Sequence, residues 1–239
     1  MRKLIAIPRS LLFAIAFFGM TIPWVLVAYV AQAISRNLFM TVIRGWSRYH
    51  RFCARWIVGQ RVIFEGELPT GAAFYVLKHE SMFETIDLPW LLGMPMIAAK
   101  KELLDIPLWG KMGRAYGLLP VDREAGASAL RQLRTDARTA LAAGRSLCLF
   151  PEGTRVEHGD APPLKSGFAG LYVMIQMPVI PVAVLSGPVN PPGGFLRYPG
   201  IVRYRVGEVV PPGLDRKVAE ERVHAAINAL NTLDDQPTA

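Results

Sequence analysis

An uninterrupted apolar run near the beginning of the chain places the strongest constraint on its fold. From Ser10 to Ser35 the sequence reads SLLFAIAFFGMTIPWVLVAYVAQAIS and contains no charged residue. A straight helix of this length extends about 39 Å, which exceeds the ~30 Å thickness of the hydrocarbon core of a bilayer. We therefore expect an N-terminal helical segment that associates with a membrane.

Pro23 leaves two arrangements open for this run. A proline inside a helix removes a backbone hydrogen bond and often breaks the helix. Each half of the run is only about 18–20 Å long and cannot cross a bilayer alone, so a shallow re-entrant hairpin is an alternative to a single span. Basic residues flank the run on both sides, which fits a segment that enters and leaves on the cytoplasmic face.

A cleaved signal peptide is a further alternative for the same run. The tripeptide Ala31-Gln32-Ala33 resembles a cleavage site. The apolar run is, however, longer than the roughly 7–15 residues typical of the apolar region of a signal peptide. We therefore expect an anchor that stays attached.

The charges are divided unevenly between this arm and the remainder. Residues 1–61 hold nine Arg and Lys and no acid, whereas residues 62–239 have a net charge of −1. A helical pattern over residues 38–58 places four arginines, spaced 4, 3 and 4, along one face: Arg44, Arg48, Arg51 and Arg55. Such a helix suits an anionic membrane surface, packing on the globular part, or nucleic acid. Because it follows a long apolar run, we favour the membrane surface and expect no nucleic-acid partner.

The remainder has the composition and periodicity of a globular α/β domain. With 51% hydrophobic residues and two cysteines, the chain is neither disordered nor a disulfide scaffold. Strands are indicated at 62–65, 72–77, 96–99, 117–121, 146–150, 179–185 and, as a strand or hairpin arm, 201–210; helices are indicated at 82–92, 102–116, 127–143 and 215–233. This alternation predicts a mixed, largely parallel sheet flanked by helices. The domain would span 61–233, after anchoring helices in 1–60 and before a disordered tail at 234–239.

His79 and Glu84 form the first candidate for chemistry. The segment KHESMFE runs from the end of a predicted strand into a helix. If Ser81 caps that helix, His79 lies in the preceding loop and Glu84 in the first turn, so the two side chains can meet. A carboxylate that holds one ring nitrogen leaves the other free to act as a general base. The alternative is structural, because Ser81-x-x-Glu84 is also a capping box, and the segment by itself favours neither interpretation.

Two further strand ends carry arginines. In FPEGTR, residues 150–155, Gly153 allows close approach to the backbone and Arg155 offers a fork of donors suited to phosphate, although the same residues also make an ordinary turn. In GLLPVDR, residues 117–123, Arg123 leaves a strand and either binds an anion or pairs with a neighbouring acid. Such strand ends are where α/β proteins usually place their sites.

Motifs of several other enzyme classes are absent from the sequence. It has no Gly-x-Ser-x-Gly elbow, no Walker A loop and no Gly-x-Gly-x-x-Gly fingerprint. The four histidines lack the spacing of metal ligands. We therefore expect neither a metal nor a cofactor.

Taken together, these segments resemble the glycerolipid acyltransferase family, which has four ordered sequence blocks. His79 to Glu84 matches the His-x-x-x-x-Asp/Glu block, with Glu where Asp is more usual. Residues 117–123 match the second block, residues 150–155 match Phe-Pro-Glu-Gly-x-Arg in full, and residues 179–182 match Val-Ile-Pro-Val. The resemblance spans roughly residues 60–190, and its third block is the most specific.

The resemblance implies an acyltransferase that moves a fatty acyl chain from acyl-CoA or acyl-carrier protein to the hydroxyl of lysophosphatidic acid, giving phosphatidic acid. His79, oriented by Glu84, would be the catalytic base. The substrate-binding residues would be Lys100, Arg123, Glu152, Gly153, Thr154 and Arg155. The active site would lie on the cytoplasmic face of the membrane. Alternatives are another acceptor, such as lyso-ornithine lipid, a phospholipase, or a non-catalytic protein that binds anionic lipid at the membrane surface.

Overall fold

A seven-stranded sheet forms the centre of the protein. The computed structural model describes residues 2–121 and 126–233. The strands are β1 (Gln60–Glu65), β2 (Phe74–Leu77), β3 (Met96–Lys100), β4 (Leu119–Val121), β5 (Leu147–Leu149), β6 (Val179–Leu185) and β7 (Gly200–Val206). Their order is β1-β7-β6-β2-β5-β3-β4, and every neighbouring pair is parallel except β6–β7. The predicted mixed, largely parallel sheet is therefore confirmed.

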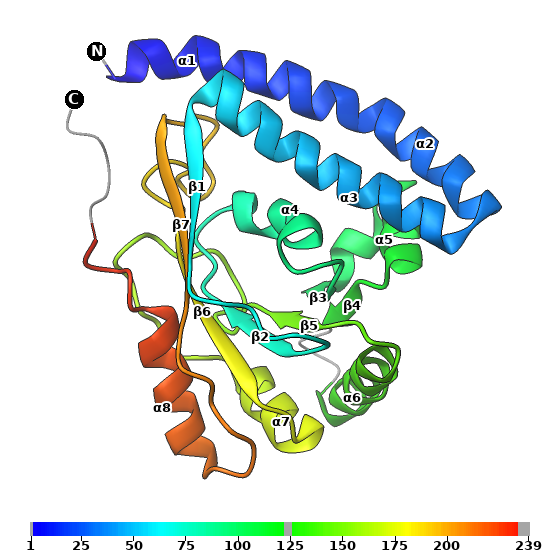
Figure 1. Cartoon of the computed structure of the whole chain (residues 1–239), viewed down its shortest axis with the longest axis vertical. Coiled ribbons are helices and arrows are strands. Elements are labelled where there is room, and N and C mark those ends of the chain that lie inside the picture. Colours follow the sequence, from blue (N-terminus) through cyan, green and yellow to red (C-terminus); the bar gives the residue numbers. More distant parts are fainter. Residues whose placement is uncertain (1, 122–125, 234–239) are drawn as a thin grey trace.

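Helices cover both faces of this sheet (Figure 1). One face carries the N-terminal helices with α4 (Met82–Leu91), the short η3 (Lys101–Asp105) and α5 (Trp109–Tyr116); the other carries α6 (Gly126–Ala142), α7 (Ser166–Ile175) and α8 (Arg216–Ile227). Along β2, Tyr75 and Leu77 belong to the core on the first side, whereas Phe74 and Val76 belong to the core on the second. Alternate strand residues point to opposite faces, so a strand covered on both sides has a continuous apolar sequence.

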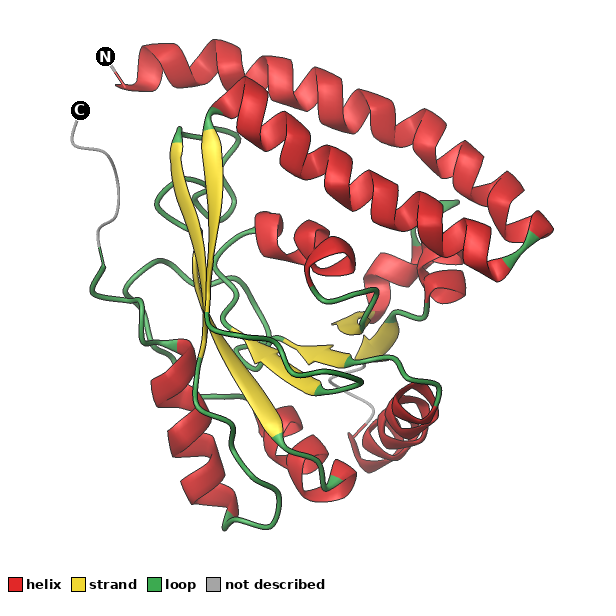
Figure 2. Cartoon of the chain, viewed as in Figure 1, coloured by secondary structure: helices red, strands yellow, loops and turns green. Residues whose placement is uncertain are grey.

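The N-terminal arm is a pair of long antiparallel helices. The first comprises α1 (Arg2–Phe13), the π-helical η1 (Ala14–Gly19) and α2 (Met20–Ile34); the second comprises α3 (Arg36–Cys53) and η2 (Ala54–Val58). We call these residues the helical hairpin. Strand β1 follows directly, and Figure 2 shows β1 and β7 extending side by side from the sheet to the end of the hairpin.

The chain reverses at Ser35, and of the two arrangements left open for Pro23 the structure has the helix that continues through it. Ser35 is extended, with φ −163°, and its hydroxyl accepts a hydrogen bond from the backbone N–H of Leu38, so it caps α3. Pro23 lies inside α2 without ending it. The π-helical turns just before it change the usual backbone pairing, and the hydroxyl of Thr21 donates to the Phe17 carbonyl at 2.8 Å. Such local adjustments let a helix accommodate a proline.

The outer side of the hairpin is apolar and exposed. Within the described residues, one helix is long and apolar enough to cross a membrane by length and composition, Leu4–Ile34. Its exposed side chains include Leu4 at 73%, Ile22 at 70% and Ile34 at 68% of their full accessibility. This surface is far larger than the scattered apolar residues of an ordinary protein surface.

The inner side of the hairpin is joined tightly to α4. The Ser47 hydroxyl donates to the Ile86 carbonyl at 2.7 Å and accepts the Trp90 backbone N–H at 3.2 Å. It therefore bridges a donor and an acceptor four residues apart in α4, where Pro89 disturbs the helix. Arg51 forms two hydrogen bonds with the buried carboxylate of Asp87.

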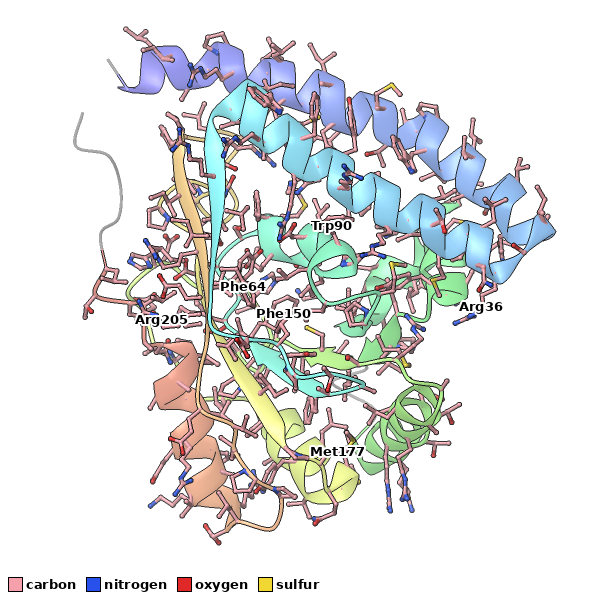
Figure 3. The ribbon with its side chains drawn as sticks, viewed as in Figure 1. Arg36, Phe64, Trp90, Phe150, Met177 and Arg205 are labelled. Atoms are coloured by element: carbon pink, nitrogen blue, oxygen red, sulfur yellow. The ribbon has the colours of Figure 1, made fainter. Side chains whose placement is uncertain are left out.

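The arginine row of α3 and η2 borders the domain at α4, so packing on the globular part, one of the alternatives left open, accounts for part of it. Arg44 and Arg48 lie over the ring of Trp90, at 4.9 and 5.4 Å from its centre, and Figure 3 shows Trp90 beneath α3. Arg51 pairs with the carboxylate of Asp87. The partners on α4 explain this packing, because an aromatic face and a buried carboxylate both attract guanidinium groups. Arg44, Arg48 and Arg55 are exposed, so a contact of these three with a membrane surface stays a prediction.

Candidate active site

Four strand ends bring polar residues to one edge of the sheet. β2, β5, β3 and β6 run parallel, so their carboxyl ends meet there. His79 follows β2, Phe150 follows β5, Lys100 ends β3 and Ser186 follows β6. This edge is the usual position of a site in an open α/β sheet.

His79 is held by two contacts that leave one ring nitrogen available. Its Nδ1 atom lies 2.9 Å from Oε1 of Glu84, and its ring stacks on Phe150 with the centres 4.2 Å apart. The side chain is 16% exposed. No hydrogen bond from another described residue reaches its Nε2 atom. A neutral imidazole that donates from Nδ1 to a carboxylate presents an unprotonated Nε2, which is the form that a general base requires.

Glu84 both caps α4 and orients His79. Ser81 is the N-cap of α4, and the capping box is complete. Oε1 of Glu84 accepts hydrogen bonds from the backbone N–H groups of Glu80 and Ser81, at 2.7 and 2.6 Å, as well as from His79. Oε2 lies within 2.8 Å of the hydroxyls of Ser81 and Ser186. The same carboxylate therefore completes the capping box and holds the ring of His79, the two interpretations that the motif left open.

These contacts keep Glu84 ionised. Glu84 is fully buried, and burial by itself raises the pKa of a carboxyl group. The hydrogen bonds and charge of His79, together with the donors of Ser81, outweigh that effect and hold the pKa of Glu84 below its ordinary value. A negative charge beside His79 favours the imidazolium that forms when the ring accepts a proton.

Glu152 supports the same histidine from the third sequence block. Its Oε2 accepts the backbone N–H of His79 at 2.8 Å, and its Oε1 lies 3.5 Å from Nζ of Lys78. Lys78 is fully buried and also donates to the Asp160 carbonyl and to Oδ1 of Asn228, at 2.7 and 2.6 Å. Glu152 is 2% exposed, and burial raises its pKa above the ordinary value despite Lys78.

A second histidine–glutamate pair lies next to the first. Nδ1 of His158 is 2.9 Å from Oε1 of Glu80, and Oε2 of Glu80 accepts the backbone N–H groups of Ser186 and Gly187, both at 2.8 Å. This pair ties the loop after β5 to the loop after β6. Sequence reasoning missed it because 78 residues separate its members; the one signal was a second acidic residue directly after His79.

The remaining predicted residues that the structure describes end β3 or follow β5 at the same edge. Lys100 is exposed at the end of β3, two strands from β2. Gly153 has a left-handed backbone with φ +71°, in a turn closed by its N–H to the Phe150 carbonyl at 3.1 Å. Thr154 and Arg155 are exposed. Arg123 lies outside the described residues, as does the tail at 234–239.

Comparison with known proteins assigns the family. Residues 61–185 match the model of the acyltransferase family, and the matched part makes up just over half of the chain. The chain belongs to the acyltransferase family. It is therefore an acyltransferase, and the family suggested by the sequence blocks is confirmed.

Relatives of this acyltransferase carry one recurring name. A protein of Pseudomonas aeruginosa named 1-acyl-sn-glycerol-3-phosphate acyltransferase is 27% identical over 203 residues, covering 83% of this chain and 79% of that protein. A protein of Cocos nucifera with the same name is 31% identical over 134 residues, covering 55% of this chain and 43% of the relative. The chain thus spans less than half of the plant relative.

A solved structure shares the complete fold. The 1-acyl-sn-glycerophosphate (LPA) acyltransferase PlsC from Thermotoga maritima superposes on this acyltransferase with a TM-score of 0.74, at 22% sequence identity. The superposition covers 99% of this chain and 100% of that one, so it includes the helical hairpin.

Proposed function

We propose that this acyltransferase transfers a fatty acyl chain from a thioester donor, acyl-CoA or acyl-carrier protein, to the hydroxyl of lysophosphatidic acid. The observation that carries the proposal is the 2.9 Å contact between Nδ1 of His79 and Glu84, which leaves Nε2 free at the carboxyl edge of the sheet. The names of the relatives support the acceptor. The product is phosphatidic acid.

In the proposed reaction, Nε2 of His79 takes the proton of the acceptor hydroxyl. The hydroxyl oxygen attacks the thioester carbonyl, an ester bond forms, and the C–S bond breaks. The departing thiolate then receives the proton from the imidazolium. Glu84 stabilises the imidazolium through its buried negative charge. No acyl-enzyme is needed, because both substrates are held together at one site. The chemistry requires no metal or cofactor.

We assign acceptor binding to the arginine and lysine side chains at the same edge. Arg155 follows the turn at Gly153 and provides a planar fork of donors for phosphate. Lys100 is the second cationic candidate at this edge, and Arg123, which lies outside the described residues, is a third that rests on the sequence blocks alone. The turn that presents Arg155 is formed by Glu152, Gly153 and Thr154. Glu152 is held in place by its buried contacts with His79 and Lys78.

The helical hairpin provides the proposed contact with the membrane. Its exposed apolar side lets acyl tails remain in the bilayer while the headgroup reaches the sheet edge. Charges on both flanks of the apolar run favour a hairpin on the cytoplasmic side, where soluble thioester donors are available.

The test is thiol release from acyl-CoA or acyl-carrier protein by the purified full chain in detergent micelles, with and without lysophosphatidic acid. We expect acceptor-dependent release and phosphatidic acid as product, both lost in His79→Ala. His224→Ala is the matched control, because His224 lies on α8 and its ring nitrogen Nε2 is within hydrogen-bond distance of the carbonyls of Ala161 and Pro162.

Other outcomes separate the alternatives. Release with lyso-ornithine lipid and none with lysophosphatidic acid would replace the proposed acceptor. Free fatty acid as product would indicate a hydrolase. Equal release by wild type and His79→Ala would remove His79 from the mechanism. Binding to anionic lipid with no release from either donor would favour a non-catalytic lipid-binding protein.

A further inference from the structure

A small pocket lies between the helical hairpin, α4 and two loops at the sheet edge. His50 of α3, Phe83 of α4, Arg155 of the loop after β5, and Asn190 and Arg197 of the loop after β6 all contribute to its lining. The cavity measures about 40 Å³. One water molecule needs roughly 10–15 Å³, so the pocket admits a small polar group and excludes an acyl chain.

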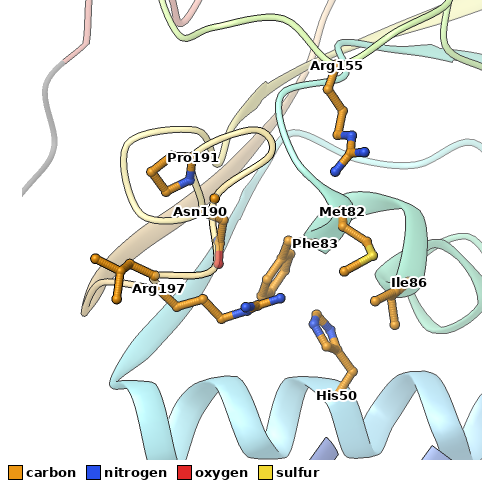
Figure 4. Close-up of a pocket in the computed structure, with 10 residues that line it drawn as sticks. His50, Met82, Phe83, Ile86, Arg155, Asn190, Pro191 and Arg197 are labelled. Atoms are coloured by element: carbon orange, nitrogen blue, oxygen red, sulfur yellow. The ribbon is translucent and has the colours of Figure 1, made fainter. Parts of the chain in front are cut away.

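Two guanidinium groups enter this pocket from different loops. Figure 4 shows the side chains of Arg155 and Arg197 pointing toward it from different sides, Arg155 from above and Arg197 from the left of the view. Arg197 lies over the rings of Phe13 and Phe18, 4.5 and 5.7 Å from their centres, and Nη1 donates to the Phe195 carbonyl at 3.2 Å. In the part of the chain that the structure describes, no carboxylate pairs with Arg197. A cation withdrawn from water without an acidic partner favours an anion beside it.

Two residues that line the pocket, His50 and Asn190, each carry a buried polar atom that lacks a partner within the described residues, Nδ1 of His50 and Nδ2 of Asn190. His50 is 2% and Asn190 8% exposed. Gln60 fixes the orientation of Asn190, because its amide donates to the carbonyls of Val189 and Tyr198 and, from the same nitrogen, to Oδ1 of Asn190. Nδ2 is therefore the donor left over, and buried donors are rarely left unused.

The pKa of His50 is lowered partly by positive charges near the pocket. The ring of His50 packs edge-on against Phe17 and Phe83, 4.9 and 4.7 Å from their centres. Burial, with the nearby charges of Arg197 and Arg51, lowers the pKa of His50 to about 3. His50 is therefore neutral at physiological pH, and its unpartnered nitrogen serves as a neutral hydrogen-bonding group.

We propose that this pocket binds the phosphate group of the acceptor, with Arg197 and Arg155 as cationic contacts and Asn190 and His50 as neutral ones. The inference rests on the proposed function. Arg197 lies beyond residues 61–185, the part matched by the family, and outside all four sequence blocks. Its contacts with Phe13 and Phe18 place it directly under the hairpin, so a lipid phosphate meets it while the acyl tail stays beside apolar helix surface.

The first test compares steady-state kinetics of the full chain in uncharged detergent micelles. Arg197→Ala should raise the KM for lysophosphatidic acid about tenfold or more, as expected for a lost hydrogen bond to a charged group. It should leave kcat and the KM for the donor within about twofold, since Arg197 does not contact His79 or Glu84. Arg197→Lys should be intermediate, because it keeps the charge but not the fork. Arg222→Ala is the matched control, an exposed arginine on α8.

A second variant keeps the proposal testable if Arg197→Ala does not fold. Asn190→Asp is nearly isosteric and preserves the oxygen that accepts from Gln60. It places a negative charge beside Arg197, so it should raise the KM for lysophosphatidic acid without lowering the melting temperature. An unchanged KM in a folded Asn190→Asp protein would overturn the proposal.

A binding measurement separates this proposal from the proposed function. sn-Glycerol 3-phosphate and inorganic phosphate should each raise the melting temperature of the wild type but not of Arg197→Ala. That result supports the phosphate pocket even if lysophosphatidic acid is not a substrate. Equal stabilisation of both proteins, with an equal KM, overturns it. A third outcome is that Arg197→Ala binds less well to vesicles containing phosphatidylglycerol, binds normally to phosphatidylcholine vesicles, and has an unchanged KM for lysophosphatidic acid. In that case Arg197 contacts bilayer lipid and the proposal is wrong.

Discussion

Nδ1 of His79 lies 2.9 Å from Oε1 of Glu84, and that oxygen also accepts the backbone N–H groups at the start of α4. One carboxylate therefore determines both where the helix begins and how the catalytic ring is turned. Any displacement of the helix start moves the proposed base with it. Because Glu84 is fully buried, water does not compete for these contacts.

Glu84→Gln should separate the two roles of this residue. A glutamine oxygen can still accept the backbone donors, and its amide can face the hydroxyls of Ser81 and Ser186, which can accept. The helix cap survives, so the melting temperature should stay within a few degrees of wild type. The negative charge beside His79 is lost, so kcat should fall about 10²–10⁴-fold, the usual contribution of general acid–base catalysis. A fall in melting temperature of many degrees, with kcat of the folded protein unchanged, would indicate that Glu84 is a purely structural residue.

The site was predictable from sequence where neighbouring residues in the chain form it. His79 and Glu84 are five positions apart, and capping-box geometry brings them together. The supporting contacts were not predictable, because their partners lie far apart in sequence. Ser186 reaches Glu84 across 102 positions and Asn228 reaches Lys78 across 150.

The fold, like the site, was predictable from the sequence in some parts and not in others. Strand β6 is buried throughout, and its continuous apolar sequence indicated it correctly. Helix α7 was missed, because SGFAGLYVMI is apolar nearly all round and has no clear helical period. Pro23 left two arrangements open in the sequence, and the helix continues through it because the π-helical turns before it accommodate the proline. The direction of Arg51 depended on Asp87, whose position only the folded chain provides.

Lys78→Met should destabilise the protein strongly. The variant leaves the buried carboxylate of Glu152 without its cation and removes a donor from Asn228. Breaking one partner of a buried pair costs about 3–5 kcal/mol, so the free energy of unfolding by denaturant should fall by a similar amount. The double variant Lys78→Met/Glu152→Gln should lose less than the single one, because no unpaired charge remains. Additive losses would show that the two side chains do not interact.

Charges on the outer side of the hairpin should weaken membrane binding. Ile22 and Val30 are 70% and 62% exposed, and an aspartate at the centre of a bilayer costs up to about 2.5–3.5 kcal/mol. Ile22→Asp and Val30→Asp should therefore reduce the fraction of protein that floats with phosphatidylcholine–phosphatidylglycerol vesicles. Val173→Asp is the control, since Val173 is 51% exposed on α7, across the sheet from the hairpin. Equal loss in the control would mean that the hairpin is not the membrane contact.

The pair of His158 and Glu80 should make stability depend on pH. The hydrogen bond and charge of Glu80 raise the pKa of His158 above its ordinary value of 6.5, despite partial burial. A histidine whose pKa is raised by folding contributes stability that is complete below its unfolded pKa and is lost as pH rises through the folded one. The melting temperature of wild type should therefore exceed that of His158→Gln by more at about pH 6 than at about pH 9. In a Glu80→Gln background, where the amide oxygen can still accept from Ser186 and Gly187, the same substitution should show no such pH dependence. A difference that stays constant across this range would mean that His158 is not charged in the folded protein.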